Sequence, residues 1–143
     1  MEQSFENLLS LKTIPEEAAS REHTLFFDEI HDCVISEWRG FVSKQLLITG
    51  AIQGLRLLKQ HNCGNLLIDQ RQVHGTWADL SDWQQHIWLP NALQVGLKKY
   101  ALVATFGSYS ALTMEGSFER FGDQLEIMLF SDLSEAKSWL AGF

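Results

Sequence analysis

The chain has 143 residues, 45% of them hydrophobic, which suits one folded domain with a single core rather than a disordered chain. Its formal net charge of −7 argues against a nucleic-acid partner, because phosphates need clustered lysine and arginine, and equally against an anionic membrane surface. No apolar run approaches the roughly 20 residues of a membrane-spanning helix, so membrane insertion is not predicted.

The N-terminal residues differ in pattern from the rest of the chain. Residues 1–22 hold a short amphipathic stretch and a helix start at Pro15, and we interpret them as an extension of a domain that spans residues 23–143. The start lacks the basic and continuous apolar parts of a secretory signal. Cys33 and Cys63 belong to no Cys-x-x-Cys pair, so two free thiols in a reducing, cytoplasmic setting are expected.

Two short runs at the start of this domain predict a β-hairpin. Residues 25–30 and 33–38 are β-prone, and His31 with Asp32 between them predicts a two-residue turn. Gly40 ends the second run.

A long helix is predicted over residues 44–62. Ser43 precedes it as an N-cap, and apolar residues recur through it at helical spacing. Gly50 and Gly54 lie four residues apart within it. Because glycine weakens a helix, we expect another part of the backbone to approach there.

The next stretch is the most informative part of the chain. Residues 66–68 are continuously apolar, as in a central strand covered on both faces, and Asp69 ends the strand. A helix is predicted over residues 79–88. At 3.6 residues per turn Trp83 faces the core, whereas Trp88 is turned away from it by roughly 140° and is expected to cover a different surface or stay partly exposed.

The remaining elements continue the alternation of strands and helices. A strand over residues 100–106, a helix through Phe121 and a strand over residues 125–130 are predicted, and Asp132 with Glu135 makes a capping-box-like start for a last helix. The predicted order is therefore ββαβαβαβα. It indicates an α/β fold with a mostly parallel central sheet, an N-terminal β-hairpin and helices packed on the sheet.

Four short motifs, in their order and spacing, carry a resemblance to a known family. They are Trp38-x-Gly40, the strand Leu66 to Asp69, Gly96-x-Lys98-x-x-Ala101, and Phe130-x-Asp132-x-x-Glu135-Ala136-x-x-Trp139-Leu140. Together they resemble the SpoIIAA-like branch of the STAS superfamily (sulfate transporters and anti-sigma factor antagonists) over roughly residues 24–141. The resemblance implies a sheet layered with helices. Its small stand-alone members include domains whose folds are similar to lipid carriers.

The regulatory serine of that superfamily is matched only in part. Its antagonists carry Asp-Ser-Ser/Thr-Gly at the start of the helix after the central strand, where a partner kinase phosphorylates the serine. This chain has Asp79-Leu80-Ser81-Asp82 instead. The glycine is missing and a phosphate on Ser81 would lie between two carboxylates, which argues against a phosphorylation switch.

Polar side chains leave the central strand together at its carboxyl end, where ligands gather in open α/β sheets. Asp69, Arg71 and His74 form this group and are suited to hold an anion or a polar group of a partner. The alternative is structural: Asp69 bonds backbone N–H groups of the turn while Arg71 pairs with it.

Aromatic residues come next in the same stretch. Trp77 and Trp88, with Pro90, form either an exposed apolar patch, as in binding hot spots, or part of the core. The predicted binding set, for a partner or a ligand, is Asp69, Arg71, His74, Trp77, Ser81 and Trp88.

No catalytic, metal or cofactor signature is complete. The chain has no Gly-x-Ser-x-Gly, no His-Glu-x-x-His and no glycine-rich phosphate loop, and no two of its five histidines are three or four residues apart. We therefore predict no metal and no cofactor.

Three functions remain open. The preferred one is a non-catalytic regulatory or interaction domain that contacts a protein partner, or a second copy of itself, around residues 69–90. The alternatives are a carrier of a small apolar, lipid-like ligand and, with least support, a hydrolase that uses Asp69, His74 and Ser81. For the preferred function, Trp88→Ala is expected to weaken association and Trp83→Ala to weaken the fold.

Overall fold

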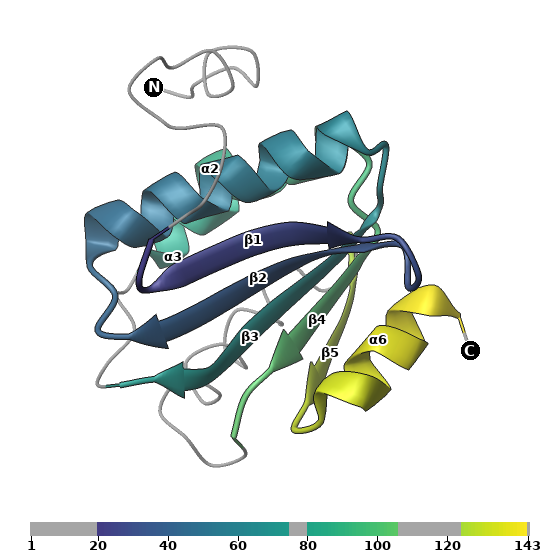
Figure 1. The fold of residues 1–143 in the computed structure, drawn as a ribbon. Coiled ribbons are helices and arrows are strands. Elements are labelled where there is room, and N and C mark those ends of the chain that lie inside the picture. The colour runs from purple at the N-terminus through teal and green to yellow at the C-terminus, as the bar shows by residue number, and fades with distance from the viewer. Residues whose placement is uncertain (1–19, 75–79, 106–123, 143) are drawn as a thin grey trace.

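The computed structural model describes residues 20–74, 80–105 and 124–142. In it, one sheet has the strand order β1-β2-β3-β4-β5 (Figure 1). The strands are β1 (His23–Asp28), β2 (Cys33–Gly40), β3 (Asn65–Val73), β4 (Lys99–Val103) and β5 (Glu126–Phe130). β1 is antiparallel to β2, and each later pair of neighbours is parallel. The predicted α/β architecture, with a mostly parallel sheet that begins in an antiparallel hairpin, is confirmed.

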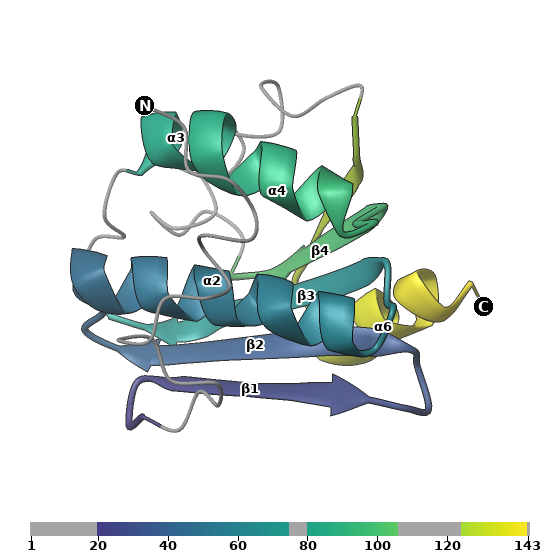
Figure 2. The same cartoon turned by 90° about the horizontal axis from the view of Figure 1, so that it is seen from above.

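Helices cover both faces of the sheet (Figures 1 and 2). α2 (Lys44–Gln60) and a continuous helical segment from Ser81 to Gln94 pack on one face, and α6 (Leu133–Ala141) packs on the other. The segment consists of α3 (Ser81–Trp83), a π-helical turn η1 (Gln84–Trp88) and α4 (Leu89–Gln94). The helix predicted through Phe121 and most of the predicted N-terminal extension lie outside the described residues.

Local signals place the helix starts where the sequence predicts them. Ser43 caps α2, its hydroxyl accepting a hydrogen bond from the backbone N–H of Leu46 at 3.1 Å. Asp132 caps α6 in the same way through the N–H of Glu135, also at 3.1 Å. Gly40 ends β2 at a φ of 73°, a left-handed conformation that favours glycine.

The hairpin turn is longer than predicted. Asp28 pairs with Cys33 across the hairpin, so four residues connect the strands instead of two. The Asp28 carboxylate accepts the backbone N–H groups of Ile30 at 3.0 Å and His31 at 3.1 Å, and Asp32 adopts a φ of 51°. An aspartate side chain therefore organises this turn, which is why it forms without glycine.

The two glycines of α2 differ in their surroundings. A Cβ on Gly50 would overlap the Trp38 indole and lie 2.8 Å from Cε1 of His23, whereas nothing lies within 4 Å of a Cβ placed on Gly54. Side chains, and not another backbone as predicted, therefore require glycine at position 50.

This difference predicts opposite effects of the same substitution. Gly54→Ala should raise the free energy of unfolding by about 0.8–1.0 kcal/mol, because alanine favours a helix interior over glycine. Gly50→Ala should lower it by about 1–3 kcal/mol through overpacking. Urea denaturation followed by circular dichroism measures both, and two changes of the same sign would contradict the packing of the His23 and Trp38 rings on α2.

Candidate functional site

A β-bulge re-aims the side chains at the carboxyl ends of β2 and β3. Glu37 pairs with Asp69 and Arg39 with Gln72, so a two-residue step on β2 faces a three-residue step on β3. β3 consequently runs on to Val73, four residues beyond the Asp69 end predicted from the sequence. Bulges of this kind change the face to which later side chains point.

An open groove of about 690 Å³, the strand-end groove, lies at this end of the sheet. It is lined by Arg21, Glu22, Arg39, Gly40, Phe41, Arg71, Gln72 and His74. The lining comes from the start of β1 and from the ends of β2 and β3. Two residues of the predicted binding set, Arg71 and His74, are therefore brought together.

Asp69 holds Arg71 in place. Its carboxylate accepts the backbone N–H of Arg71 at 3.1 Å, the guanidinium Nε at 3.0 Å and Nη2 at 2.9 Å. Hydrogen bonding to Asp69 raises the pKa of Arg71 above its usual value. Asp69 therefore has the structural role considered for it: it bonds the backbone of the strand end and pairs with Arg71. The guanidinium group of Arg71 keeps its remaining N–H donors for other partners.

The groove also contains residues that were not predicted from the sequence. Arg39 donates from Nη1 to the carbonyl of Arg21 at 3.3 Å and from Nη2 to the hydroxyl of Thr24. Phe41 is 79% exposed and its ring lies 5.9 Å from that of His74. A large apolar residue directly after the strand-ending glycine is the signal that would have pointed to Phe41.

Trp88 lies in the core instead of an exposed patch. It is 6% exposed, its Nε1 donates to the carbonyl of Ala51 at 3.2 Å, and its ring meets Tyr100 edge-on. Of the two interpretations of Trp88, an exposed patch or part of the core, the second holds, and its place in the predicted binding set is corrected. Trp77 lies outside the described residues, and so does the side chain of Ser81, although its backbone begins α3.

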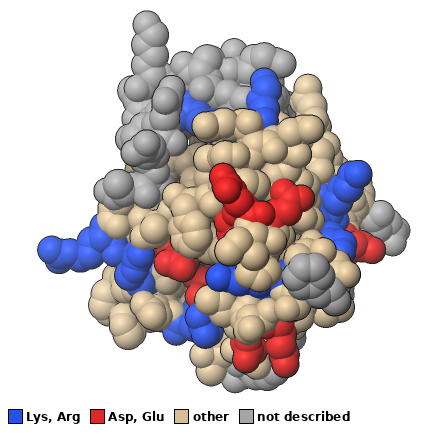
Figure 3. All heavy atoms as spheres, turned by 45° about the vertical axis from the view of Figure 1, so that its right-hand side comes forward, with Lys and Arg blue, Asp and Glu red and all other residues tan. Residues whose placement is uncertain are grey.

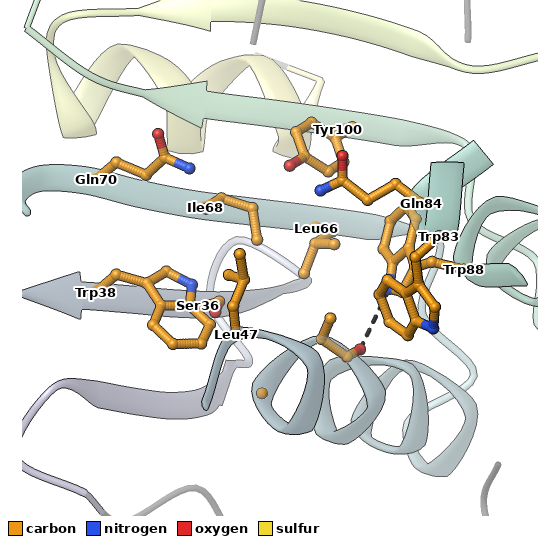
Figure 4. A pocket seen from close by; sticks show the side chains of 12 residues that line it. Ser36, Trp38, Leu47, Leu66, Ile68, Gln70, Trp83, Gln84, Trp88 and Tyr100 are labelled. Atoms are coloured by element: carbon orange, nitrogen blue, oxygen red, sulfur yellow. Dashed lines mark hydrogen bonds between the residues drawn. The ribbon is translucent and has the colours of Figure 1, made fainter. Parts of the chain in front are cut away.

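The π turn explains this correction. The N–H of Leu89 bonds the carbonyl of Gln84, five residues earlier, instead of one four residues earlier as in an α-helix. Residues five apart therefore lie one turn apart, which brings Trp83 and Trp88 to the same side. Both line a cavity of about 50 Å³ between α2 and the sheet, with Trp38 at its other end (Figure 4).

A buried histidine packs against Trp38, which lies at one end of the cavity. His23 is 1% exposed, stacks on Trp38 with 3.7 Å between ring centres, and hydrogen-bonds the hydroxyl of Ser36 at 2.6 Å. Burial, helped by the positive charge of Arg39, lowers the pKa of His23 to about 4. The ring is therefore neutral near pH 7.

Other features of the described residues are less specific. On the side of the molecule where α6 and the hairpin turn lie, acidic and basic side chains are interspersed (Figure 3). No three His, Cys, Asp or Glu side chains in the described ranges gather in a way that could hold a metal ion. None of the helices in those ranges has the length and apolarity to cross a membrane.

Comparison with known proteins supports the fold. No family model and no curated protein matches the sequence. A crystal structure of an uncharacterised DUF3478-family protein from Shewanella loihica PV-4, described as having a SpoIIAA-like fold, is similar with a TM-score of 0.54 and 18% identity. The match covers 86% of this chain and 98% of the other. Together with the strand order, it shows that the chain is a domain with a SpoIIAA-like fold.

Proposed function

We propose that this chain is a non-catalytic regulatory or interaction domain whose strand-end groove binds an acidic segment of a protein partner. The observation that carries the proposal is Phe41, a large aromatic side chain that is 79% exposed beside a groove lined by arginines. Aromatic and arginine side chains are the residues most enriched in binding hot spots.

The arginines of the groove favour an acidic partner. Arg71 is fixed by Asp69, and Arg39 by Thr24 and the carbonyl of Arg21, so both guanidinium groups lose little conformational freedom on binding. Each keeps further N–H donors for a carboxylate. Glu22 also lines the groove and Asp69 pairs with Arg71, so the three arginines of the lining exceed these two nearby carboxylates by one charge. The remaining net negative charge of the chain acts weakly where it lies more than about 8 Å away, because it is screened at physiological ionic strength.

Binding of labelled peptides tests the proposal. Fluorescence anisotropy should show that glutamate-rich peptides with one leucine or aromatic anchor bind, and that lysine-rich counterparts do not. Phe41→Ser should weaken this binding at least tenfold, and added salt should weaken it further. Ile30→Ser is the matched control, because Ile30 is 83% exposed but lies in the hairpin turn at the other end of the sheet.

Equal binding by the Phe41→Ser and Ile30→Ser proteins would remove the groove from consideration. Absence of acidic-peptide binding together with a dimer in light scattering, dissociated by Phe41→Ser, would instead identify a second copy of the chain as the occupant.

Both free cysteines are buried, and we place the domain in a reducing, cytoplasmic environment on that basis.

The two alternatives have less support. The cavity of about 50 Å³ is roughly a third of the size that accepts benzene in a protein core, which does not suit a lipid. For hydrolysis, Asp69 is occupied by Arg71, and the buried His23–Ser36 pair offers a histidine with a pKa near 4, far from the value near 7 that suits a general base.

A further inference from the structure

The tryptophan-lined cavity shares none of its described lining residues with the strand-end groove, and one of these residues, Gln70, has an unpaired side-chain oxygen. Gln70 is 3% exposed and lines the cavity, and its Oε1 has no hydrogen-bond partner among the described residues. Along β3, Leu66 and Ile68 share the face of Gln70 and line the same cavity. A leucine at position 70 would continue the apolar face without burying an unpaired carbonyl, so folding alone does not explain the glutamine.

Further polar groups line the same space. In Figure 4 the carboxamides of Gln70 and Gln84 and the hydroxyl of Tyr100 lie along one side of the cavity, and tryptophans stand at its two ends. Gln84 comes from the first residue of the π turn η1 and Tyr100 from β4, so polar groups of two further elements face the cavity beside Gln70.

We propose that the cavity binds a small neutral molecule that donates an O–H or N–H hydrogen bond to Gln70. None of the described residues that line the cavity is charged, so an ionic ligand would be buried there without a counterion from them. The volume of about 50 Å³ limits the occupant to the size of a short-chain alcohol or amide. The apolar part of the ligand lies against the indoles, and its polar end meets the carboxamide.

An isomer pair tests the donor directly. 2-Propanol and methoxyethane have the same atoms, but only 2-propanol has an O–H donor. In ¹H–¹⁵N spectra, 2-propanol should shift the indole N–H signals of Trp38, Trp83 and Trp88 with a dissociation constant in the millimolar range, and methoxyethane should bind at least fivefold more weakly. Trp139, on the other face of the sheet in α6, serves as the internal reference.

Gln70→Leu separates binding from folding. This protein should melt at the same or a higher temperature than the unsubstituted chain and should lose at least tenfold in affinity for 2-propanol. Gln72→Leu is the matched control, because Gln72 lies on the same strand but lines the strand-end groove. It should retain 2-propanol binding.

Three results would overturn the proposal. The first is equal binding of the two isomers, and the second is unchanged affinity for 2-propanol after Gln70→Leu. The third is the absence of any indole N–H shift up to molar 2-propanol, which would mean that water alone fills the cavity. None of these results bears on peptide binding at Phe41, so the proposals for the cavity and for the groove are tested independently.

Discussion

Trp88→Ala is expected to lower the free energy of unfolding by about 3–5 kcal/mol, the range for emptying a large aromatic site in a core. The indole packs in the main apolar cluster, meets Tyr100 edge-on, and is hydrogen-bonded to Ala51 of α2. Because Trp88 lines the cavity of about 50 Å³, its removal would enlarge that cavity. Urea denaturation followed by far-ultraviolet circular dichroism measures the loss without relying on the deleted fluorophore.

Two further variants separate the contributions to this loss. Trp83 is only partly buried, so Trp83→Ala should cost less than half as much as Trp88→Ala. Trp88→Phe keeps most of the apolar surface and removes the bond to Ala51, which should cost about 1 kcal/mol beyond the change in packing. A larger loss for Trp83→Ala than for Trp88→Ala would contradict the deeper burial of Trp88.

The sequence did not predict that Trp83 and Trp88 lie on the same side of their helical segment. A regular α-helix places them on different faces, and only the five-residue hydrogen bond of η1 brings them together. Pro90 is the signal that was available. In a regular helix its ring would crowd the carbonyl four residues earlier, at His86, and a widened turn just before Pro90 relieves that clash.

Features with a local cause were predictable. Helix caps at Ser43 and Asp132 depend on side chains within three residues, and the alternation of strands and helices specifies a parallel sheet through the handedness of its connections. The pairing of Arg71 with Asp69 is also local, and it was one of the two outcomes considered for that strand end.

The groove depends on features that sequence does not display. Arg39 and Phe41 line one groove with His74 because β2 and β3 are in one particular register with a bulge between them. Arg21 lines it too, because β1 pairs antiparallel with β2. Register is determined by contacts across the sheet. The residues of one strand end were therefore predictable, but their neighbours from two other strands were not.

A large response to acidic pH is expected from His23. Its pKa is about 4 in the folded chain and about 6.5 in an unfolded chain, because folding buries the ring against Trp38 near the charge of Arg39. Above pH 7.5 the ring is neutral in both states and contributes no pH dependence. Between pH 6.5 and pH 4 the unfolded chain holds a proton that the folded chain does not. As the pH is lowered through this range, the free energy of unfolding should therefore decrease by about 1.4 kcal/mol per pH unit, to a total loss of about 3 kcal/mol.

His23→Gln isolates this contribution. Glutamine retains a hydrogen bond to Ser36 but does not titrate, so its free energy of unfolding should change less than that of the unsubstituted chain between pH 7.5 and pH 5, by about 2 kcal/mol. This window lies above the range in which most carboxylates titrate, which keeps their protonation out of the comparison. His86→Gln, at an exposed position, serves as the matched histidine substitution. Parallel pH profiles for the His23→Gln and unsubstituted proteins would mean that His23 is protonated in the folded state, and the stack on Trp38 would then have to include a buried charge.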